Sequence, residues 1–237
     1  MASHWFRSTT HSMSCGIAAT ALVVASGVAA AATSLTYSGY SVMGDQTLNV
    51  LFPSTESGQA GEFQLVTGSG VIDAWCIDLF NYLSSSGTYD VASFSGSLPG
   101  VPALTTRQIG EIGALVRNGD SLVASPPTGY SANDVGAAIQ IAIWSLEYPG
   151  FSYTWSPAHP IADALATTYL GDATTGVWAP YFGVRALVET TATDQTLVAG
   201  IPEPSTWAMA SIGFAALAWT AWGRRGRRPM HTKGEAR

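Results

Sequence analysis

Residues 137–148, AAIQIAIWSLEY, are the stretch from which the rest of the chain can be interpreted. Apolar residues surround almost the whole circumference of this predicted helix, and such a helix is buried on most sides. Gln140 lies in its middle and carries a side-chain amide with two donors and one acceptor. Burial of an amide is costly unless its polar atoms are satisfied. We therefore expect Gln140 either to form hydrogen bonds in the core or to be chemically altered.

The N-terminal end of the 237-residue chain has the pattern of a processing signal. Residues 1–32 begin with a polar segment, continue as an apolar run and end in an Ala-x-Ala type cleavage site at Ala30, Ala31 and Ala32, which is typical of a secretory signal peptide. A short membrane anchor is the alternative interpretation. Cys15 precedes the apolar run, so it does not match a lipoprotein cysteine.

The C-terminal end carries a second signal, in three parts. A rigid Pro-Glu-Pro motif precedes an uncharged apolar run at residues 207–222, and a basic cluster follows. The basic cluster indicates the cytoplasmic side of a transmembrane helix. The residues that mark this signal are Pro202, Glu203, Pro204, Arg224 and Arg225.

This order of features resembles the PEP-CTERM sorting signal. The resemblance implies a Gram-negative host that makes exopolysaccharide, and an exosortase that cuts near the Pro-Glu-Pro motif. It also implies transient anchoring in the inner membrane before release to the cell surface or the extracellular matrix. The predicted segments are therefore a signal peptide at 1–32, a domain at 33–200, the sorting signal at 201–228 and a cytoplasmic tail at 229–237.

The composition of the predicted domain excludes several classes of function. It contains three arginines and fourteen acidic residues, a net charge of −11, whereas the whole chain has a net charge of −6. So acidic a domain argues against nucleic acid as a partner. With one histidine and one cysteine it has no cluster of metal ligands, and it lacks phosphate-binding and dinucleotide motifs. We therefore expect neither a metal nor a cofactor.

The sequence predicts a single α+β domain with an antiparallel β core and two or three helices. Gly44 and Asp45 predict a turn between the first two strands. The predicted strands are residues 35–43, 47–52, 61–67, 71–79 and 88–94, with a closing hairpin at 184–190 and 195–199. The predicted helices are residues 106–118 before Gly119, a central helix from the Ser131 capping box to Pro149, and residues 161–170 before Gly171.

Cys76 is the only cysteine left once the signal peptide is removed. A lone cysteine in an exported protein has no partner for an internal disulfide. It can be buried and inert, form a disulfide between two chains, or be committed to other chemistry. These alternatives remain open on the sequence alone.

The segments around Cys76 and Gln140 resemble the Cys–Gln thioester domains of bacterial surface adhesins. Those domains carry an aromatic-Cys-aliphatic strand and a Thr-Gln-x-Ala-Ile-Trp type helix. Ile139 departs from this pattern, because it stands where the family has threonine. The matching residues are Trp75, Cys76, Ile77, Gln140, Ala142, Ile143 and Trp144.

The resemblance implies that the Cys76 sulfur attacks the side-chain carbonyl of Gln140, expels ammonia and leaves a thioester. The thioester would then acylate an amine or a hydroxyl. The residue-level alternative is that Cys76 is a small buried hydrophobe and that Gln140 has backbone partners. Supporting candidates are Trp75, Asp78, Trp144 and His159, with Glu147 as a further flanking acid.

Each supporting candidate also has a plainer interpretation. His159 is a candidate base for acyl transfer, although a loop histidine before proline is more often merely exposed. Asp78 and Glu147 either orient groups at the two motifs or lie at solvated ends of a strand and a helix. Four aromatic residues are candidates for a sugar-stacking surface or for ordinary packing: Tyr153, Trp155, Trp178 and Tyr181.

Two hypotheses of function follow. The first is an exosortase-processed surface or matrix protein that captures a surface or matrix target covalently through a thioester. The second is a non-covalent structural or polysaccharide-binding module of an exopolysaccharide matrix. A turnover enzyme is not expected, because the sequence contains no acid–base constellation.

Overall fold

The computed structural model describes residues 33–155, 157–189 and 194–201, which belong to one compact unit. The predicted signal peptide, sorting signal and tail lie outside the described residues, and those predictions stay untested. The described strands are β1 (Thr33–Phe52), β2 (Glu56–Thr67), β3 (Gly70–Cys76), β4 (Gly87–Ser93), β5 (Ser152–Trp155), β6 (Arg185–Glu189) and β7 (Leu197–Ala199). The described helices are α1 (Thr106–Ala124), α2 (Ala132–Glu147) and α3 (Pro160–Thr174).

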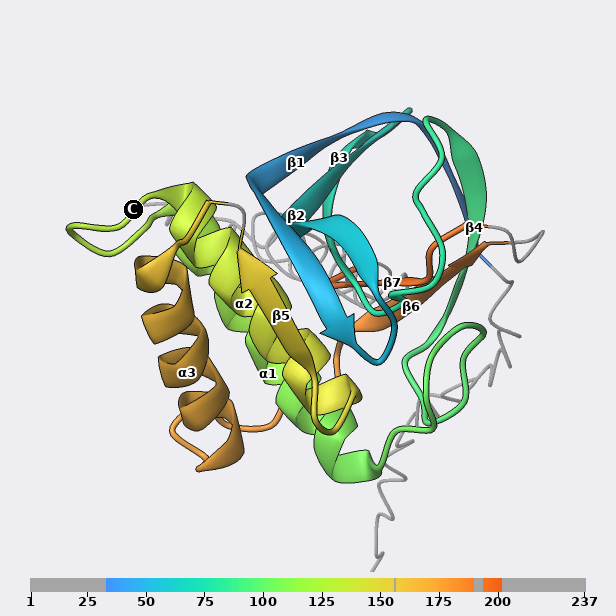
Figure 1. Cartoon of the computed structure of the whole chain (residues 1–237). Helices are drawn as coiled ribbons and strands as arrows, with labels where there is room; N and C mark the ends of the chain where they lie inside the picture. The colour runs from blue at the N-terminus through green and yellow to red at the C-terminus, as the bar shows by residue number, and fades with distance from the viewer. Residues whose placement is uncertain (1–32, 156, 190–193, 202–237) are drawn as a thin grey trace, which may run out of the picture. The chain divides into compact units, whose positions relative to one another are not determined.

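The strands form one antiparallel sheet that closes on itself (Figure 1). Their order is β2-β3-β7-β6-β4-β1-β5, and β1 pairs additionally with β2. The length of β1 makes this closure possible, because its first residues pair with β4, its middle with β2 and its last residues with β5. The predicted α+β class, with an antiparallel core and three helices, is confirmed for the described residues.

The predicted turn at Gly44 and Asp45 is wrong. The chain continues through this point as one strand, and the pairing register with β2 shifts between Met43 and Gln46. Both halves of β1 pair with the same neighbour, so the two residues produce a bulge rather than a reversal of direction.

Two helices run past the glycines that were predicted to end them. Gly119 lies inside α1, where an added Cβ would come within 2.9 Å of the side chains of Ile139 and Trp75. The glycine therefore permits close packing and does not cap the helix. Gly171 likewise lies inside α3.

The central helix follows the prediction closely. Ser131 caps α2 and forms a capping box with Asp134, and Tyr148 is the C-cap before Pro149. The helix is buried along most of its length because it packs against α1 and α3 on one side and against β1 and β2 on the other (Figure 1). Among the described residues, none of the helices has the length and apolar content needed to cross a membrane.

Candidate functional site

Cys76 and Gln140 lie in direct contact in the core. The Cys76 amide N–H donates a hydrogen bond to Gln140 Oε1 at 3.0 Å, and Gln140 Nε2 donates to the Cys76 carbonyl oxygen at 2.7 Å. Cys76 is 1% exposed and Gln140 is fully buried. The last residue of β3 is thus paired with the middle of α2 across 64 positions of sequence. The Gln140 amide therefore forms hydrogen bonds in the core, which is one of the two alternatives that its buried position allowed.

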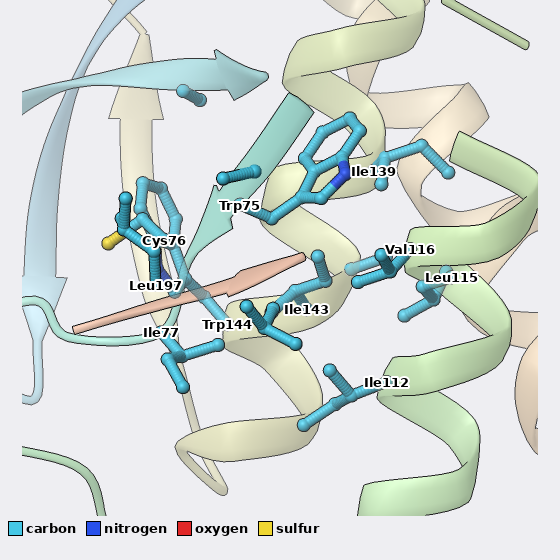
Figure 2. Close-up of a cluster of buried hydrophobic side chains, with 14 of the residues drawn as sticks. Trp75, Cys76, Ile77, Ile112, Leu115, Val116, Ile139, Ile143, Trp144 and Leu197 are labelled. Carbon is cyan, nitrogen blue, oxygen red and sulfur yellow. The ribbon is translucent and has the colours of Figure 1, made fainter. Parts of the chain in front are cut away.

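The Cys76 thiol takes no part in these two hydrogen bonds. Its Sγ–H donates to the carbonyl oxygen of Asp78 at 3.0 Å. Burial raises the pKa of the thiol well above its usual range, and the Glu147 carboxyl raises it further. The thiol is therefore neutral at pH 7. Figure 2 shows Cys76 with Trp144 beside it, among apolar side chains that include Ile77 and Leu197.

Asp78 is fully buried and holds the turn that follows β3. Its carboxylate accepts hydrogen bonds from the Phe80 N–H at 2.9 Å and from Asn81 Nδ2 at 2.7 Å. Gly100 approaches so closely that an added Cβ would overlap the Asp78 carboxylate. The expectation of a solvated strand end is wrong here. The turn that Asp78 holds instead fixes its own backbone carbonyl, which accepts the hydrogen bond from the Cys76 thiol.

The C-terminal turns of α2 carry three polar groups close to Cys76. Glu147 is 1% exposed, so the expectation of a solvated helix end is wrong for it too. Burial raises its pKa well above the usual range, and Asp78 adds to the effect. Sequence reasoning underrated Glu147, although its place seven residues after Gln140 puts both on one helix face. Trp144 Nε1 and the Tyr148 hydroxyl complete the group.

Trp75 precedes Cys76 in β3 but lies on the other face of the strand. It follows the alternation of the strand and points to the opposite face, toward Ile139 and α1 (Figure 2). Its indole N–H donates to Asp120 Oδ1 at 2.8 Å. Burial raises the pKa of Asp120 to about 6, despite this hydrogen bond.

His159 lies apart from Cys76 and Gln140 in its described contacts. It precedes α3 without capping the helix, and its ring packs edge-on against Trp155. Its electrostatic influence reaches Asp134, at the N-terminal end of α2. The structure therefore does not bring this candidate base together with the predicted pair.

The aromatic residues proposed for sugar stacking divide into separate contacts. Tyr153 and Trp155 pack edge to face, and both donate to Asp163 Oδ1 at 2.6 Å. Trp178 stacks on Tyr169, and Tyr181 lies under the Arg117 guanidinium. These contacts account for the four side chains by packing within the domain.

A small cavity borders the site. Its volume is about 130 Å³, and its wall includes Trp144, Leu79, Asn81 and Gln195. Gln195 Nε2 also donates to the carbonyl oxygen of Asp78, at 2.9 Å. The cavity therefore reaches the residues that surround the Cys76 thiol. Within the described part of the chain, no group of three or more His, Cys, Asp or Glu side chains is placed to hold a metal ion.

Comparison with models of protein families finds no match, and comparison with curated proteins finds no relative. Similar solved structures include the N-terminal domain of the pilus tip adhesin Cpa of Streptococcus pyogenes, with a TM-score of 0.48 and 14% identity, covering 71% of this chain and 99% of that one. Another is the N-terminal thioester domain of fibronectin-binding protein SfbI of the same organism, with a TM-score of 0.37, 14% identity and coverage of 71% and 95%.

A third is the N-terminal thioester domain of a surface protein from Clostridium perfringens, with a TM-score of 0.41, 8% identity and coverage of 71% and 99%. At these identities and TM-scores, the likeness assigns neither a family nor a function to this chain.

Proposed function

We propose that Cys76 and Gln140 form an internal thioester, through which the protein attaches itself covalently to an amine or a hydroxyl. The proposal is carried by one observation, the direct contact between Cys76 and the Gln140 amide. The hydrogen bonds join the Gln140 amide to the backbone of Cys76 and so keep the two residues side by side, and such proximity replaces a bimolecular encounter by an intramolecular step. The protein would act once, as an acyl donor, and not turn over as an enzyme.

The surroundings of the pair suit acyl transfer. The Cys76 N–H already donates to Gln140 Oε1, the oxygen on which negative charge develops during attack. Both residues are shielded from water, which protects a thioester from hydrolysis. In the reaction, the Cys76 sulfur bonds to Gln140 Cδ, the Cδ–Nε2 bond breaks, and ammonia leaves with the thiol proton.

The proposed location of the protein rests on the signals predicted at the two ends of the sequence. A signal peptide at residues 1–32 and a sorting signal at 201–228 suit an exported protein that an exosortase releases from the inner membrane. The acidic, lysine-free domain would not consume its own thioester with a side-chain amine. The proposed target is a nucleophile on a surface or in an extracellular matrix, with exopolysaccharide as a source of hydroxyl groups.

The alternative is a non-covalent structural or polysaccharide-binding module. The observation that favours it is the same pair of hydrogen bonds, because they satisfy the Gln140 amide without any chemistry. In this case Gln140 only ties α2 to β3.

Methylamine distinguishes the two functions. We expect the purified protein to incorporate one methylamine per chain at residue 140, because the thioester carbonyl is its single activated acyl group. A free Cys76 thiol should appear at the same rate, which alkylation and peptide mass spectrometry measure. Cys76→Ala is the control and should incorporate none. Absence of incorporation in the wild type, or equal incorporation in Cys76→Ala, contradicts the proposed function.

A further inference from the structure

The last turns of α2 bury polar atoms that no described group satisfies. Both carboxyl oxygens of Glu147, Trp144 Nε1 and the Tyr148 hydroxyl are inaccessible to solvent and have no hydrogen-bond partner among the described residues. Buried polar groups are nearly always paired, and leaving one unpaired costs about 1–3 kcal/mol. Asp78 differs from them, because its carboxylate is satisfied by Phe80 and Asn81.

These unsatisfied groups share a helix face with Gln140. Glu147 follows Gln140 by two helical turns, and Trp144 lies between them on the same side. Beyond Cys76 the chain runs alongside this face, because Phe80 packs against the ring of Tyr148. The Cys76 thiol points along this direction, toward the carbonyl oxygen of Asp78. The sulfur therefore extends from the Gln140 amide toward the Glu147 end of the helix.

Electrostatic coupling connects the same residues. Glu147 raises the pKa of the Cys76 thiol, and Asp78 raises the pKa of Glu147. The Trp144 indole N–H lies near enough to the sulfur to lower the pKa of the thiol, and the Tyr148 hydroxyl lies near enough to Glu147 to lower the pKa of its carboxyl, although neither contact has the geometry of a hydrogen bond. Burial is the largest effect on Glu147 and favours the protonated, neutral form of its carboxyl. A neutral carboxyl that can give up a proton thus lies within electrostatic reach of the sulfur.

We propose that Glu147 is the proton donor to the Cys76 sulfur when a nucleophile cleaves the thioester. This inference rests on the proposed function. Cleavage would otherwise release a thiolate into an apolar site that destabilises it. The unsatisfied carboxyl of Glu147 is the buried acid on the helix face that Cys76 contacts, whereas the Asp78 carboxylate is already held by two donors.

The step balances for a primary amine. The amine nitrogen bonds to Gln140 Cδ, the Cδ–Sγ bond breaks, and its electron pair remains on the Cys76 sulfur. Glu147 gives its proton to that sulfur. The proton that the amine nitrogen loses returns to the Glu147 carboxylate, so the carboxyl is restored. The products are an amide at residue 140 and a free thiol at Cys76.

The test compares rates of methylamine capture in the full chain. Glu147→Gln keeps the size of the side chain and its neutral charge but cannot give up a proton. We expect capture in the thioester-bearing fraction of this variant to be about 100-fold slower than in the wild type, the lower end of the usual range for general acid–base catalysis. Glu147→Asp retains a carboxyl group and should fall between the two. A purely structural side chain would let Gln perform as well as Glu.

Glu62→Gln is the matched control. Glu62 is also buried, and burial raises its pKa to about 9, but it interacts with Asp73 and Asp120 and not with Cys76. This variant should capture methylamine at the wild-type rate. A wild-type rate in Glu147→Gln, with the thioester present, overturns the inference and leaves the proposed function standing. Absence of the thioester from the wild type overturns both.

A second measurement serves if Glu147→Gln does not fold. Capture by the wild type should be slower in D₂O than in H₂O at the same concentration of unprotonated methylamine, because a proton moves to sulfur as the Cδ–Sγ bond breaks. Equal rates in the two solvents contradict a proton donor at this step.

Discussion

In chains that still carry the free Gln140 amide, replacement of Gln140 by alanine should lower the free energy of unfolding by about 4 kcal/mol. The change removes both hydrogen bonds to Cys76 and leaves its N–H and carbonyl oxygen buried without partners. It also opens a cavity on the buried face of α2. Cys76→Ala should cost less, because the backbone of residue 76 keeps its two bonds to Gln140. Urea unfolding of the three proteins gives the comparison.

Gln64→Ala is the control for this prediction. Gln64 is half-buried on β2 and donates a hydrogen bond to Asp73 at 3.2 Å. Water can replace that bond, so its loss should cost less than about 1 kcal/mol. If Gln140→Ala is no less stable than Gln64→Ala, then Gln140 does not tie α2 to β3.

Substitution of Gly113 by alanine should destabilise the domain by about 3 kcal/mol. An added Cβ at this position in α1 would overlap the carbonyl oxygen of Tyr181. The loop before β6 is held to α1 by the hydrogen bond from Tyr181 N–H to the Gly110 carbonyl oxygen, at 3.0 Å. Alanine would force this loop away from the helix.

Gly171→Ala provides the opposite case within a helix. No atom lies within 4 Å of a Cβ added there, so alanine should act only through helix propensity and raise stability by about 0.5–1 kcal/mol. Thermal unfolding should therefore move the two variants in opposite directions. A stabilised Gly113→Ala protein would show that the loop does not pack as described.

Local signals in the sequence predicted the elements better than their ends. The helix starts predicted at residue 106 and at the Ser131 capping box agree with α1 and α2, because capping acts within four residues. Gly119 was misread because only tertiary packing, against Ile139 and Trp75, shows why a side chain is excluded. The bulge in β1 was misread for a similar reason, since it depends on which strand lies beside the chain.

The site was only partly predictable. The burial of Gln140 followed from its apolar neighbours, and the resemblance to thioester domains suggested Cys76 as its partner. The contact itself could not be derived, because 64 positions separate the two residues. Asp78 and Glu147 were expected at solvated ends. Charged residues are seldom fully buried, and the local sign that Glu147 is buried was its helical spacing from Gln140.

The mass of the intact protein tests the central claim most directly. Wild-type protein and Cys76→Ala, processed identically, are compared with the masses calculated from their sequences. We predict that the wild type is lighter than calculated by one ammonia, that peptide mapping joins Cys76 to residue 140, and that Cys76→Ala has its full mass. A wild-type protein of full mass, with a Cys76 thiol that is alkylated after unfolding in every chain, would contradict the thioester.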